Sequence, residues 1–355
     1  ITAFDLRLDG EPYNYPPYPF SKYGFTDQNG KKWLRLPVNS PLGQTVVLTA
    51  GQLPLPPATE PGEHKFEVRV VDLQDEYDPT PVDFTFYLHR YIEPANRQGV
   101  LIIDDDPVSA QVNDALITQR YQAMLEGYSG NVNVITRTEN NEDIRQRAIA
   151  FSDLQKYKLV IYHTDNYEKT GNLQLDFDAY SLFLMRGGNL LISHTSLLGA
   201  QLTEIANGGL RKTFVTNLGF NKIPKVSYLN NSNSPFFQKA VSNMTDYNDL
   251  NLHYDVTGSP AIHPLIDLRD GLGYLSYFEN GNFSGDILYK FGCKPTTYPT
   301  YPPTSEQFDK YNGKTVAFRR TTSSNGKVYV FGFPLSFMKV EDTRPMMNKI
   351  ISELM

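Results

Sequence analysis

The chain has 355 residues, of which 40% are hydrophobic and 20% are charged. This is the composition of a globular protein, and the length suggests about two domains rather than one. The net charge of −6 argues against a nucleic-acid-binding protein, which needs a basic face. No apolar run approaches the roughly 20 residues of a membrane-spanning helix. The single cysteine, Cys293, excludes an internal disulfide framework and a cysteine-cluster zinc site.

The first 93 residues predict an all-β domain. They contain short segments in which apolar and polar residues alternate, a pattern that places one face of a strand in a core and the other in water. Asn29-Gly30 is typical of a hairpin turn, and Trp33 is a candidate core residue in the strand that follows. Several short strands with Pro and Gly turns predict an antiparallel β-sandwich. The predicted strands include residues 32–38, 45–49, 66–70 and 82–88.

The end of this domain resembles a known type of module. Residues 61–72 and 78–86 are similar to the last hairpin of immunoglobulin-like or fibronectin-type modules in exported bacterial proteins. The resemblance implies an immunoglobulin-like fold for residues 1–93. The loop of this hairpin is acidic, and its carboxylates are either ligands for Ca²⁺, which prefers hard oxygen atoms, or part of a solvated loop. The acidic residues are Asp72, Asp75, Glu76 and Asp78.

Residues 94–98 form a polar, proline-containing break that predicts a linker. After it, the pattern changes to alternating strands and helices, and continuous apolar runs such as residues 100–103 are typical of strands covered on both faces. This order predicts an α/β domain over residues 99–355 with a doubly wound, mostly parallel sheet. Further strands are predicted at residues 132–135, 159–162 and 189–193, helices from 107 to 127 and at 141–150, 178–186 and 197–206, a hairpin at 315–332 and a closing helix at 342–354.

Two helix ends are predicted from capping residues. Asp106, followed by Pro107, is the expected N-cap of the first helix of this domain. The pair Gly208-Gly209 is the expected end of the fourth helix, since glycine readily adopts the conformation that follows a helix.

Several segments of this domain resemble class I glutamine amidotransferase-like domains. The closest likeness is to their non-catalytic relatives in large exported bacterial proteins. The resemblance implies a flavodoxin-like or amidotransferase-like fold, and a protein that is secreted or lies at the bacterial cell surface. It rests on the apolar strand and acidic triplet at residues 100–106, on residues 154–162, on residues 183–193 around a Gly-Gly pair, and on residues 326–335.

Active members of that family carry a nucleophilic Cys on the turn after the strand that follows the Gly-Gly pair. Here the turn reads Ser193-His194-Thr195-Ser196, and Cys293 lies far later in the chain, so the family's reaction is expected to be absent. Adjacent side chains on a strand point to opposite faces, so Ser193 and His194 are not expected to form a catalytic dyad. The Gly-x-Ser-x-Gly pattern of serine hydrolases is also absent.

Other reactions of α/β domains find little support in the sequence. The acidic triplet resembles the opening strand of receiver domains, but Asp165 lies too late after its strand, and a Lys is missing from the expected fifth strand end. No Gly-x-Gly-x-x-Gly follows the first strand, as a dinucleotide-binding domain would require. Two short-range pairs are compatible with a metal site or with polar loops: His253 with Asp255, and His263 with Asp267.

One group of polar residues follows the predicted strand ends. Ligands of open α/β sheets bind outside the carboxyl ends of the strands, so these side chains predict a crevice for a cation, a sugar or a peptide terminus. The alternative is that they cap helices and satisfy backbone groups at strand ends. The candidates are Asp104, Asp105, Asp106, His163, Asp165, His194, Thr195 and Ser196.

Three functions are compatible with these patterns. The first is an exported, non-catalytic module that binds or spaces components at the cell envelope, with polysaccharide or other envelope proteins as partners. The second is a hydrolase of glycans or peptides that uses His194, Ser196 or His163, or a bound metal. The third is a carbohydrate-binding protein with exposed Tyr and Phe as platforms. No cofactor is predicted; Ca²⁺ or Mg²⁺ at Asp104 and Asp105, or Ca²⁺ at the hairpin acids, is the alternative.

Overall fold

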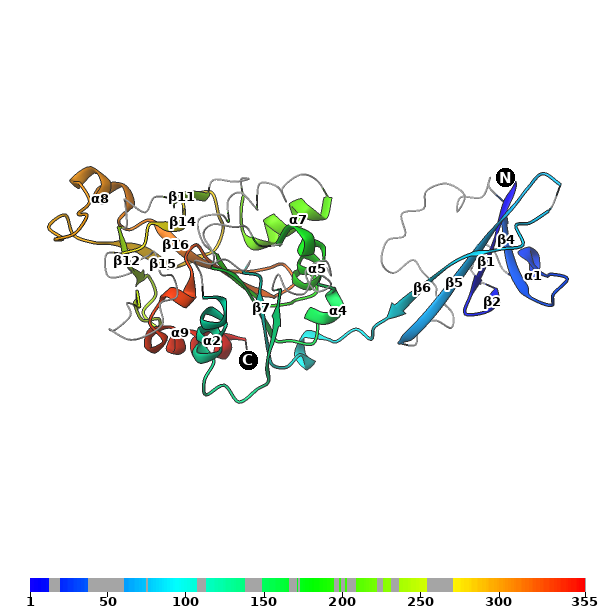
Figure 1. The fold of residues 1–355 in the computed structure, drawn as a ribbon, viewed down its shortest axis with the longest axis horizontal. Helices are drawn as coiled ribbons and strands as arrows, with labels where there is room; N and C mark the ends of the chain where they lie inside the picture. The colour runs from blue at the N-terminus through cyan, green and yellow to red at the C-terminus, as the bar shows by residue number, and fades with distance from the viewer. Residues whose placement is uncertain are drawn as a thin grey trace. The chain divides into compact units, whose positions relative to one another are not determined.

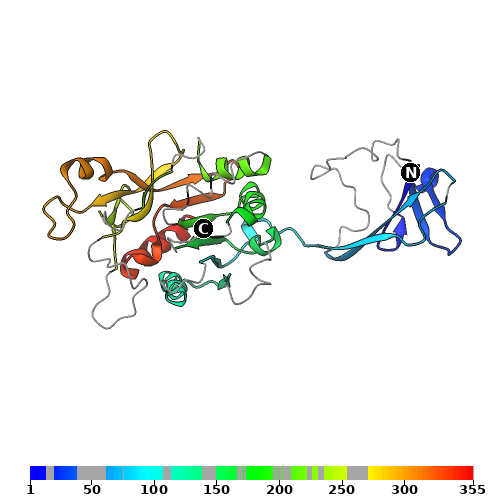
Figure 2. The same cartoon turned by 45° about the horizontal axis from the view of Figure 1, so that its top comes forward.

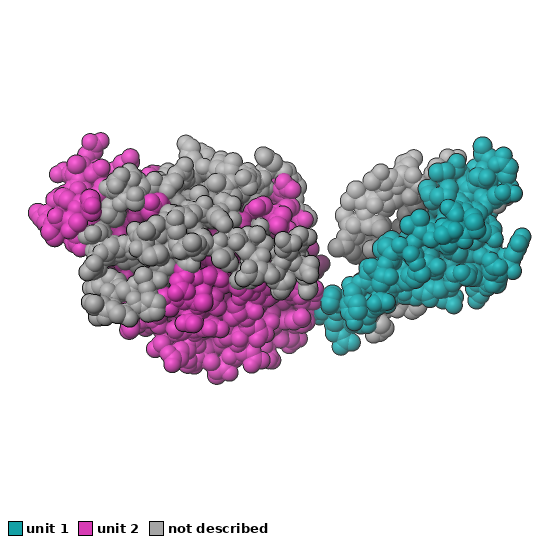
Figure 3. Space-filling model, viewed as in Figure 1, with its two compact units in different colours: residues 1–91 teal, residues 92–355 magenta. Residues whose placement is uncertain are grey.

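The chain forms two compact units, residues 1–91 and 92–355, which are coloured separately in Figure 3. None of the helices in the described part of the chain is long and apolar enough to cross a membrane. The computed structural model describes residues 1–12, 20–37, 61–74, 76–106, 113–137, 149–165, 171, 173–194, 198, 202, 209–221, 226–230, 236–253 and 271–354.

The first unit is built on an antiparallel sheet with the strand order β3-β4-β1-β5-β6, and β2 pairs with β1 (Figure 1). Three predicted strands are present as β4, β5 and β6. The predicted strand at residues 45–49 lies outside the described residues, and the β-sandwich therefore stays a prediction. The elements are β1 Ala3–Leu8, β2 Glu11–Pro12, α1 Phe20–Tyr23, β3 Gly24–Thr26, β4 Lys32–Pro37, β5 Gly62–Val71 and β6 Val82–Leu88.

Charged side chains are buried on one face of this sheet. The carboxylate of Asp5 is inaccessible to solvent and accepts hydrogen bonds from Arg35 Nε at 2.8 Å and Arg69 Nε at 3.0 Å. The guanidinium of Arg69 also lies 4.1 Å from the centre of the Trp33 ring, at a distance typical of cation–π contacts. Trp33 is fully buried, so its predicted place in the core is confirmed.

The apolar face of β6 is more exposed than its alternation predicts. Val82 is 69% exposed and Phe84 is 57% exposed, although the period-two pattern assigns both to a core. The reason is positional, because β6 ends the described sheet and has only β5 as a neighbour. Phe84 contacts the rings of Phe66 and Phe86, which together form an aromatic row on these two strands.

The second unit contains an 11-stranded mixed sheet. Five neighbouring strands, in the order β8-β7-β9-β10-β17, are parallel, and the remaining strands pair antiparallel. The parallel strands are β7 Val100–Asp104, β8 Val132–Thr136, β9 Leu159–Thr164, β10 Leu190–His194 and β17 Lys327–Phe331. The others are β11 Val226–Asn230, β12 Phe237–Ser242, β13 Leu250–Asn251, β14 Tyr274–Phe278, β15 Asp286–Cys293 and β16 Thr315–Thr321.

The sheet is thus mixed, whereas a mostly parallel one was expected. The change of direction occurs at the hairpin of β16 and β17, which is present as predicted. Its turn is too short for the helical crossover that parallel neighbours require, so β16 runs antiparallel to β17. Asn325 in this turn has a φ of 64°, a left-handed conformation that Asn tolerates better than most residues.

Helices cover both faces of the parallel strands (Figure 2). Alternate residues of β7 show the division: Val100 and Ile102 pack with α2 and α9, whereas Leu101 and Ile103 pack with α4, α5 and α7. We call these two sides of the sheet the α2 face and the α5 face. The helices are α2 Asp114–Met124, α4 Phe151–Leu154, α5 Leu173–Met185, α7 Gly209–Leu218, α8 Ser305–Tyr311 and α9 Val340–Glu353, with short 3-10 helices η2 Pro94–Asn96 and η4 Leu335–Phe337.

The predicted N-cap of the first helix is wrong. Helix α2 begins at Asp114, and its N-cap is Asn113, whose side chain accepts a hydrogen bond from Leu116 N. Asp106 is not its cap, because its carboxylate contacts a histidine instead. The predicted helix end at Gly208-Gly209 stays a prediction, because residues 203–208 lie outside the described residues; Gly209 itself begins α7. The closing helix is confirmed as α9, while the predicted helices at 141–150 and 197–206 lie almost entirely outside the described residues.

The end of α9 is held by Glu353, which accepts hydrogen bonds from Tyr329 OH at 2.9 Å and Arg319 NH1 at 2.6 Å. Burial raises the pKa of Glu353, but these donors outweigh burial and hold the pKa below its ordinary value. Because hydrogen bonds to charged groups contribute about 1.5–3 kcal/mol, we expect Glu353→Gln to lower the free energy of unfolding by about 2 kcal/mol at pH 7.

A carboxyl with a lowered pKa stabilises the protein above its unfolded pKa, here 4.5, and loses that contribution as the pH falls through its folded pKa. Urea unfolding of both proteins at several pH values should therefore show a difference that shrinks below pH 4.5. Glu126→Gln, in an exposed pair with Arg344, is the control and should change stability by less than about 0.5 kcal/mol. A pH-independent difference for Glu353→Gln would contradict this account.

Candidate functional site

The candidate residues lie at the carboxyl ends of neighbouring parallel strands. Asp104 is the last residue of β7, Thr164 of β9 and His194 of β10. In the order β8-β7-β9, the strand that comes first in the chain lies between the second and the third. This is a switch point, where the connections leave in opposite directions and open α/β sheets bind their ligands.

The period-two alternation of the strands divides the acidic triplet between the two faces. Asp104 lies on the α2 face, in register with His163 of β9, and Asp105 lies on the opposite face with Tyr162. Asp165 shares the α2 face with His163. The single crevice expected from the sequence is therefore two separate clusters.

The cluster on the α2 face, here called the Asp-His cluster, consists of Asp104, Asp106, His163 and Asp165, all of them fully buried. His163 Nδ1 lies 2.9 Å from Asp106 Oδ2, and His163 Nε2 lies 3.9 Å from Asp104 Oδ1. Asp104 also accepts a hydrogen bond from the backbone amide of Asp106 at 3.2 Å. These contacts fix the imidazole between two carboxylates.

Helix α2 adds three polar side chains to this cluster. Thr118 donates its hydroxyl to Asp104, and Asp114 lies beside the same carboxylate. The ring of Tyr121 stacks on the His163 ring, with 4.0 Å between centroids and 7° between planes. Positions 114, 118 and 121 have the spacing i, i+4 and i+7, which places them on one face of the helix. This face of α2 therefore brings all three side chains to the strand ends.

Asp165 is held by hydroxyl groups from three elements. It accepts hydrogen bonds from Tyr121 OH at 3.0 Å and from both the backbone amide and the hydroxyl of Ser336 in η4. The Oγ of Ser193 lies 3.3 Å from Asp165 Oδ1 and 3.3 Å from the carbonyl oxygen of Phe333, and it accepts a hydrogen bond from Leu335 N at 3.0 Å. Ser193 therefore joins β10 to η4 as a structural residue.

The electrostatics of the Asp-His cluster reflect an excess of carboxylates. Burial alone would lower the pKa of His163, but Asp104 and Asp106 outweigh it and raise this pKa to about 9. Burial and the Asp106 charge raise the pKa of Asp165 to about 7, and burial with Asp104 and Asp106 raises that of Asp114 to about 7. Perturbed groups gathered at strand ends mark a candidate functional site.

The cluster on the α5 face, here called the Arg137 cluster, is a buried ion pair. Arg137 NH2 lies 2.5 Å from Asp176 Oδ2, and Arg137 NH1 lies 3.7 Å from Asp105 Oδ2. Tyr162 OH donates to the same Asp105 oxygen at 2.8 Å. Burial raises the pKa of Asp176 to about 6 despite the nearby guanidinium. Asp105, which was a metal candidate from the sequence, thus has an arginine as its counter-charge.

The remaining sequence candidates fall elsewhere. His194 is buried one residue after Ser193, so the two side chains point to opposite faces of β10, as predicted. Cys293 ends β15, from which β10 is separated by β16 and β17, and burial raises the pKa of its thiol to about 11. Two strands therefore separate Cys293 from β10, and its thiol is not activated. Thr195, Ser196, Asp255, His263 and Asp267 lie outside the described residues, while the backbone amide of His253 donates to the carbonyl oxygen of Phe337.

The acidic loop between β5 and β6 uses its carboxylates in turns. Asp72 Oδ1 accepts hydrogen bonds from the amides of Gln74 and Glu76 at 2.8 and 3.0 Å, and Asp78 Oδ1 accepts one from Thr80 N at 2.8 Å. Aspartate side chains commonly bond the backbone in this way. Asp75 lies outside the described residues, and calcium binding here stays a prediction.

Sequence reasoning missed several residues that contact these carboxylates. Arg137 directly follows β8, so the rule that selected the other strand-end residues would also have selected it. Asp114, Thr118 and Tyr121 could have been found from their helical spacing. Ser336 could not, because it reaches Asp165 from a segment 171 residues later.

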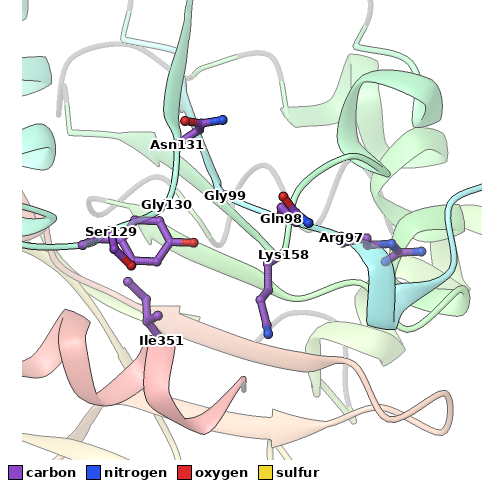
Figure 4. A pocket seen from close by; sticks show the side chains of 9 residues that line it. Arg97, Gln98, Gly99, Ser129, Gly130, Asn131, Lys158 and Ile351 are labelled. Atoms are coloured by element: carbon purple, nitrogen blue, oxygen red, sulfur yellow. The ribbon is translucent and has the colours of Figure 1, made fainter.

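A hollow of about 390 Å³ opens at the opposite end of these strands (Figure 4). Its lining includes Gly99 before β7, Asn131 before β8 and Lys158 before β9, together with Tyr128 and Ile351. It is therefore at the amino ends of the parallel strands and separate from both clusters.

No protein-family model matches the sequence, and no curated protein matches it significantly. The resemblances to amidotransferase-like and immunoglobulin-like domains therefore remain predictions from the residues.

Proposed function

We propose that this protein is an exported, non-catalytic binding protein of the bacterial cell envelope. In this proposal its second unit presents a ligand site at the carboxyl ends of its parallel strands. The strand order β8-β7-β9-β10-β17 supports a doubly wound, amidotransferase-like domain, since it is the order of flavodoxin-like sheets. The antiparallel sheet of the first unit supports an immunoglobulin-like module.

The observation that carries this proposal is the environment of Ser193. An activated serine needs a general base within hydrogen-bond reach of Oγ and an exposed approach for the substrate. Here Oγ is buried, faces the Asp165 carboxyl and the Phe333 carbonyl, and is bonded by Leu335 N. Ser193, near the end of β10, is thus used for packing, while Thr195 and Ser196 in the turn after this strand lie outside the described residues.

Activity-based labelling tests the non-catalytic part of this proposal. A fluorophosphonate probe for activated serines and iodoacetamide for activated thiols should leave the native protein unlabelled at Ser193 and Cys293, because Ser193 is buried and burial raises the pKa of the Cys293 thiol. Ser193→Ala should lose about 1–2 kcal/mol of stability through its hydrogen bonds and change no rate in a broad hydrolase screen. Ser324→Ala, at an exposed turn, is the matched control.

Two results would refute the proposal. One is labelling of Ser193 that heat denaturation abolishes, and the other is a hydrolytic activity that Ser193→Ala or His163→Ala removes. Either result would show that this domain is catalytic.

The ligand class is supported by the aromatic row on the first unit. Phe66, Phe84 and Phe86 lie side by side on β5 and β6, and Phe84 is largely exposed. Exposed aromatic rings are suitable platforms for the apolar faces of sugars, so polysaccharide is the envelope partner that this face favours. The wild-type protein should bind glycans on an array, and Phe84→Ala should remove this binding. An array to which the wild type does not bind would count against this ligand.

A further inference from the structure

His163 carries a buried polar atom without a hydrogen bond. The residue is fully buried, and its Nε2 has no hydrogen-bond partner among the described residues. Leaving such an atom unsatisfied costs about 1–3 kcal/mol, so native structures seldom do so without a reason. The nearest acid that contacts it is Asp104, whose Oδ1 lies 3.9 Å away, beyond hydrogen-bond distance.

The other side of the same imidazole is firmly held. Nδ1 lies 2.9 Å from Asp106 Oδ2, and the ring stacks on Tyr121. A neutral histidine that donates Nδ1–H to a carboxylate has its lone pair on Nε2, which is the usual arrangement of metal-binding histidines, and an ion that binds here takes the place of the Nε2 proton. Asp106 is thus placed as the orienting carboxylate, and Nε2 faces Asp104.

The distance between the two facing atoms is close to that of a shared ion. Divalent transition metals bind imidazole nitrogen at about 2.0–2.1 Å and carboxylate oxygen at about 2.0–2.2 Å, so the two atoms lie about 3.4 Å apart at a tetrahedral angle, and a side-chain movement of about 0.5 Å would bring them there. The observed separation is 3.9 Å, and ligand atoms of Asp104, Asp106 and His163 all lie within 4.8 Å of one another. We propose that the Asp-His cluster binds one divalent transition-metal ion, of the zinc or manganese class, between His163 Nε2 and Asp104.

The charges around this position favour a cation. Asp104 and Asp106 flank one imidazole, and the carboxylates of Asp114 and Asp165 act on the same group of residues. The matching acid on the other face, Asp105, already has Arg137 as its counter-charge. Asp105 therefore has a guanidinium beside it, whereas a single imidazole is shared by several carboxylates on the α2 face.

The ligand types select the metal class. Ca²⁺ and Mg²⁺ prefer all-oxygen sites, whereas an imidazole nitrogen with carboxylate oxygen suits Zn²⁺, Mn²⁺ and related ions. Asp114, beside Asp104, is the candidate for a further ligand, and water would complete the coordination. The inference does not rest on the proposed function, since a metal site here can be structural or ligand-binding.

The test is a calorimetric titration of chelator-treated, full-length protein without a histidine tag, using Zn²⁺, Mn²⁺, Mg²⁺ and Ca²⁺ separately. We expect one equivalent of Zn²⁺ or Mn²⁺ to bind with a Kd of about 1 μM or lower, and Mg²⁺ and Ca²⁺ to bind far more weakly. His163→Gln and Asp104→Asn should abolish this binding. Asp106→Asn should weaken it about 10–100-fold, because it changes only the group that orients the imidazole.

Asp105→Asn is the matched control, since it alters the next carboxylate along the chain but lies on the other face, and its metal affinity should equal that of the wild type. The proposal is wrong if the wild type binds neither Zn²⁺ nor Mn²⁺, if binding persists in His163→Gln and Asp104→Asn, or if Ca²⁺ binds as tightly as Zn²⁺. If His163→Gln does not fold, Asp106→Asn decides: unchanged affinity in that variant overturns the site.

Discussion

Replacing Arg137 with methionine is expected to lower the free energy of unfolding of the 92–355 unit by about 3–5 kcal/mol. The guanidinium is buried between Asp176 and Asp105, and its loss would leave two carboxylates in the interior without their counter-charge. Methionine has a similar length and fills the space, so the effect measures charge rather than a cavity. The cost of an unpaired buried charge exceeds that of most single substitutions.

Urea unfolding followed by far-UV circular dichroism measures this effect, and Trp33 fluorescence follows the first unit separately because Trp33 is the only tryptophan of the chain. Arg344→Met removes an exposed partner of Glu126 and should cost less than about 1 kcal/mol. The double variant Arg137→Met with Asp176→Asn should be more stable than Arg137→Met alone. A loss below about 1 kcal/mol for Arg137→Met would show that the pair is not a structural centre.

In the first unit, Asp5→Asn is expected to have an effect of similar size, about 3–5 kcal/mol. Asp5 is fully buried and accepts hydrogen bonds from Arg35 and Arg69, so the amide would leave two guanidinium groups beside each other without the charge between them. Because Arg69 also stacks on Trp33, its displacement should change the environment of the indole.

Trp33 fluorescence is therefore the measurement of choice, and a lower urea midpoint with a changed emission maximum is the expected result. Asp83→Asn is the control, because Asp83 pairs with Lys65 on the exposed part of the same sheet. If Asp5→Asn and Asp83→Asn unfold at the same urea concentration, the buried charges of this sheet do not contribute to its stability as argued.

Local patterns predicted much of the fold. The buried apolar runs predicted β7, β9 and β10, the turn at residues 323–326 predicted the final hairpin, and the spacing of apolar residues predicted α9. These features depend on neighbours in the sequence, so composition and period are sufficient to find them. The mixed sheet depends on how distant segments pair, for which the sequence has no comparable signal.

The helix ends show why capping rules alone are insufficient. Asp106 has the right residue type and a proline after it, yet His163 competes for its carboxylate. That competitor is on another strand and invisible to a local rule. In the first unit, likewise, Val82 and Phe84 follow a regular alternation, but their strand lies at the edge of the described sheet and leaves them exposed.

The candidate site shows where local rules stop. The rule that ligands bind beyond strand ends selected Asp104, Asp106, His163 and Asp165, which the structure brings together; their role in ligand binding stays a prediction. It also selected Asp105 and His194, which alternation sends to the other face. The same alternation correctly assigned Ser193 and His194 to opposite faces of their strand. Applied to the acidic triplet, it would have assigned Asp105 to the face opposite Asp104 and Asp106. Asp176 and Ser336 depend on tertiary packing and had no local signal.

The two clusters suggest how one strand end can support both stability and binding. Asp105 and Arg137 neutralise each other within the α5 face and secure the strand ends against α5. Asp104 and Asp106 hold an imidazole whose Nε2 is still available on the α2 face. Preorganised but uncompensated polar groups are typical of sites that gain stability only when their ligand binds.

The most direct test of this division is an anomalous difference map, at the zinc absorption edge, from crystals of the protein grown with Zn²⁺. We predict one strong peak on the α2 face, within about 2.0–2.2 Å of His163 Nε2 and of an Asp104 carboxylate oxygen. A peak on the α5 face beside Asp105 would contradict it. So would a map in which β7 and β9 are ordered but no peak lies near His163.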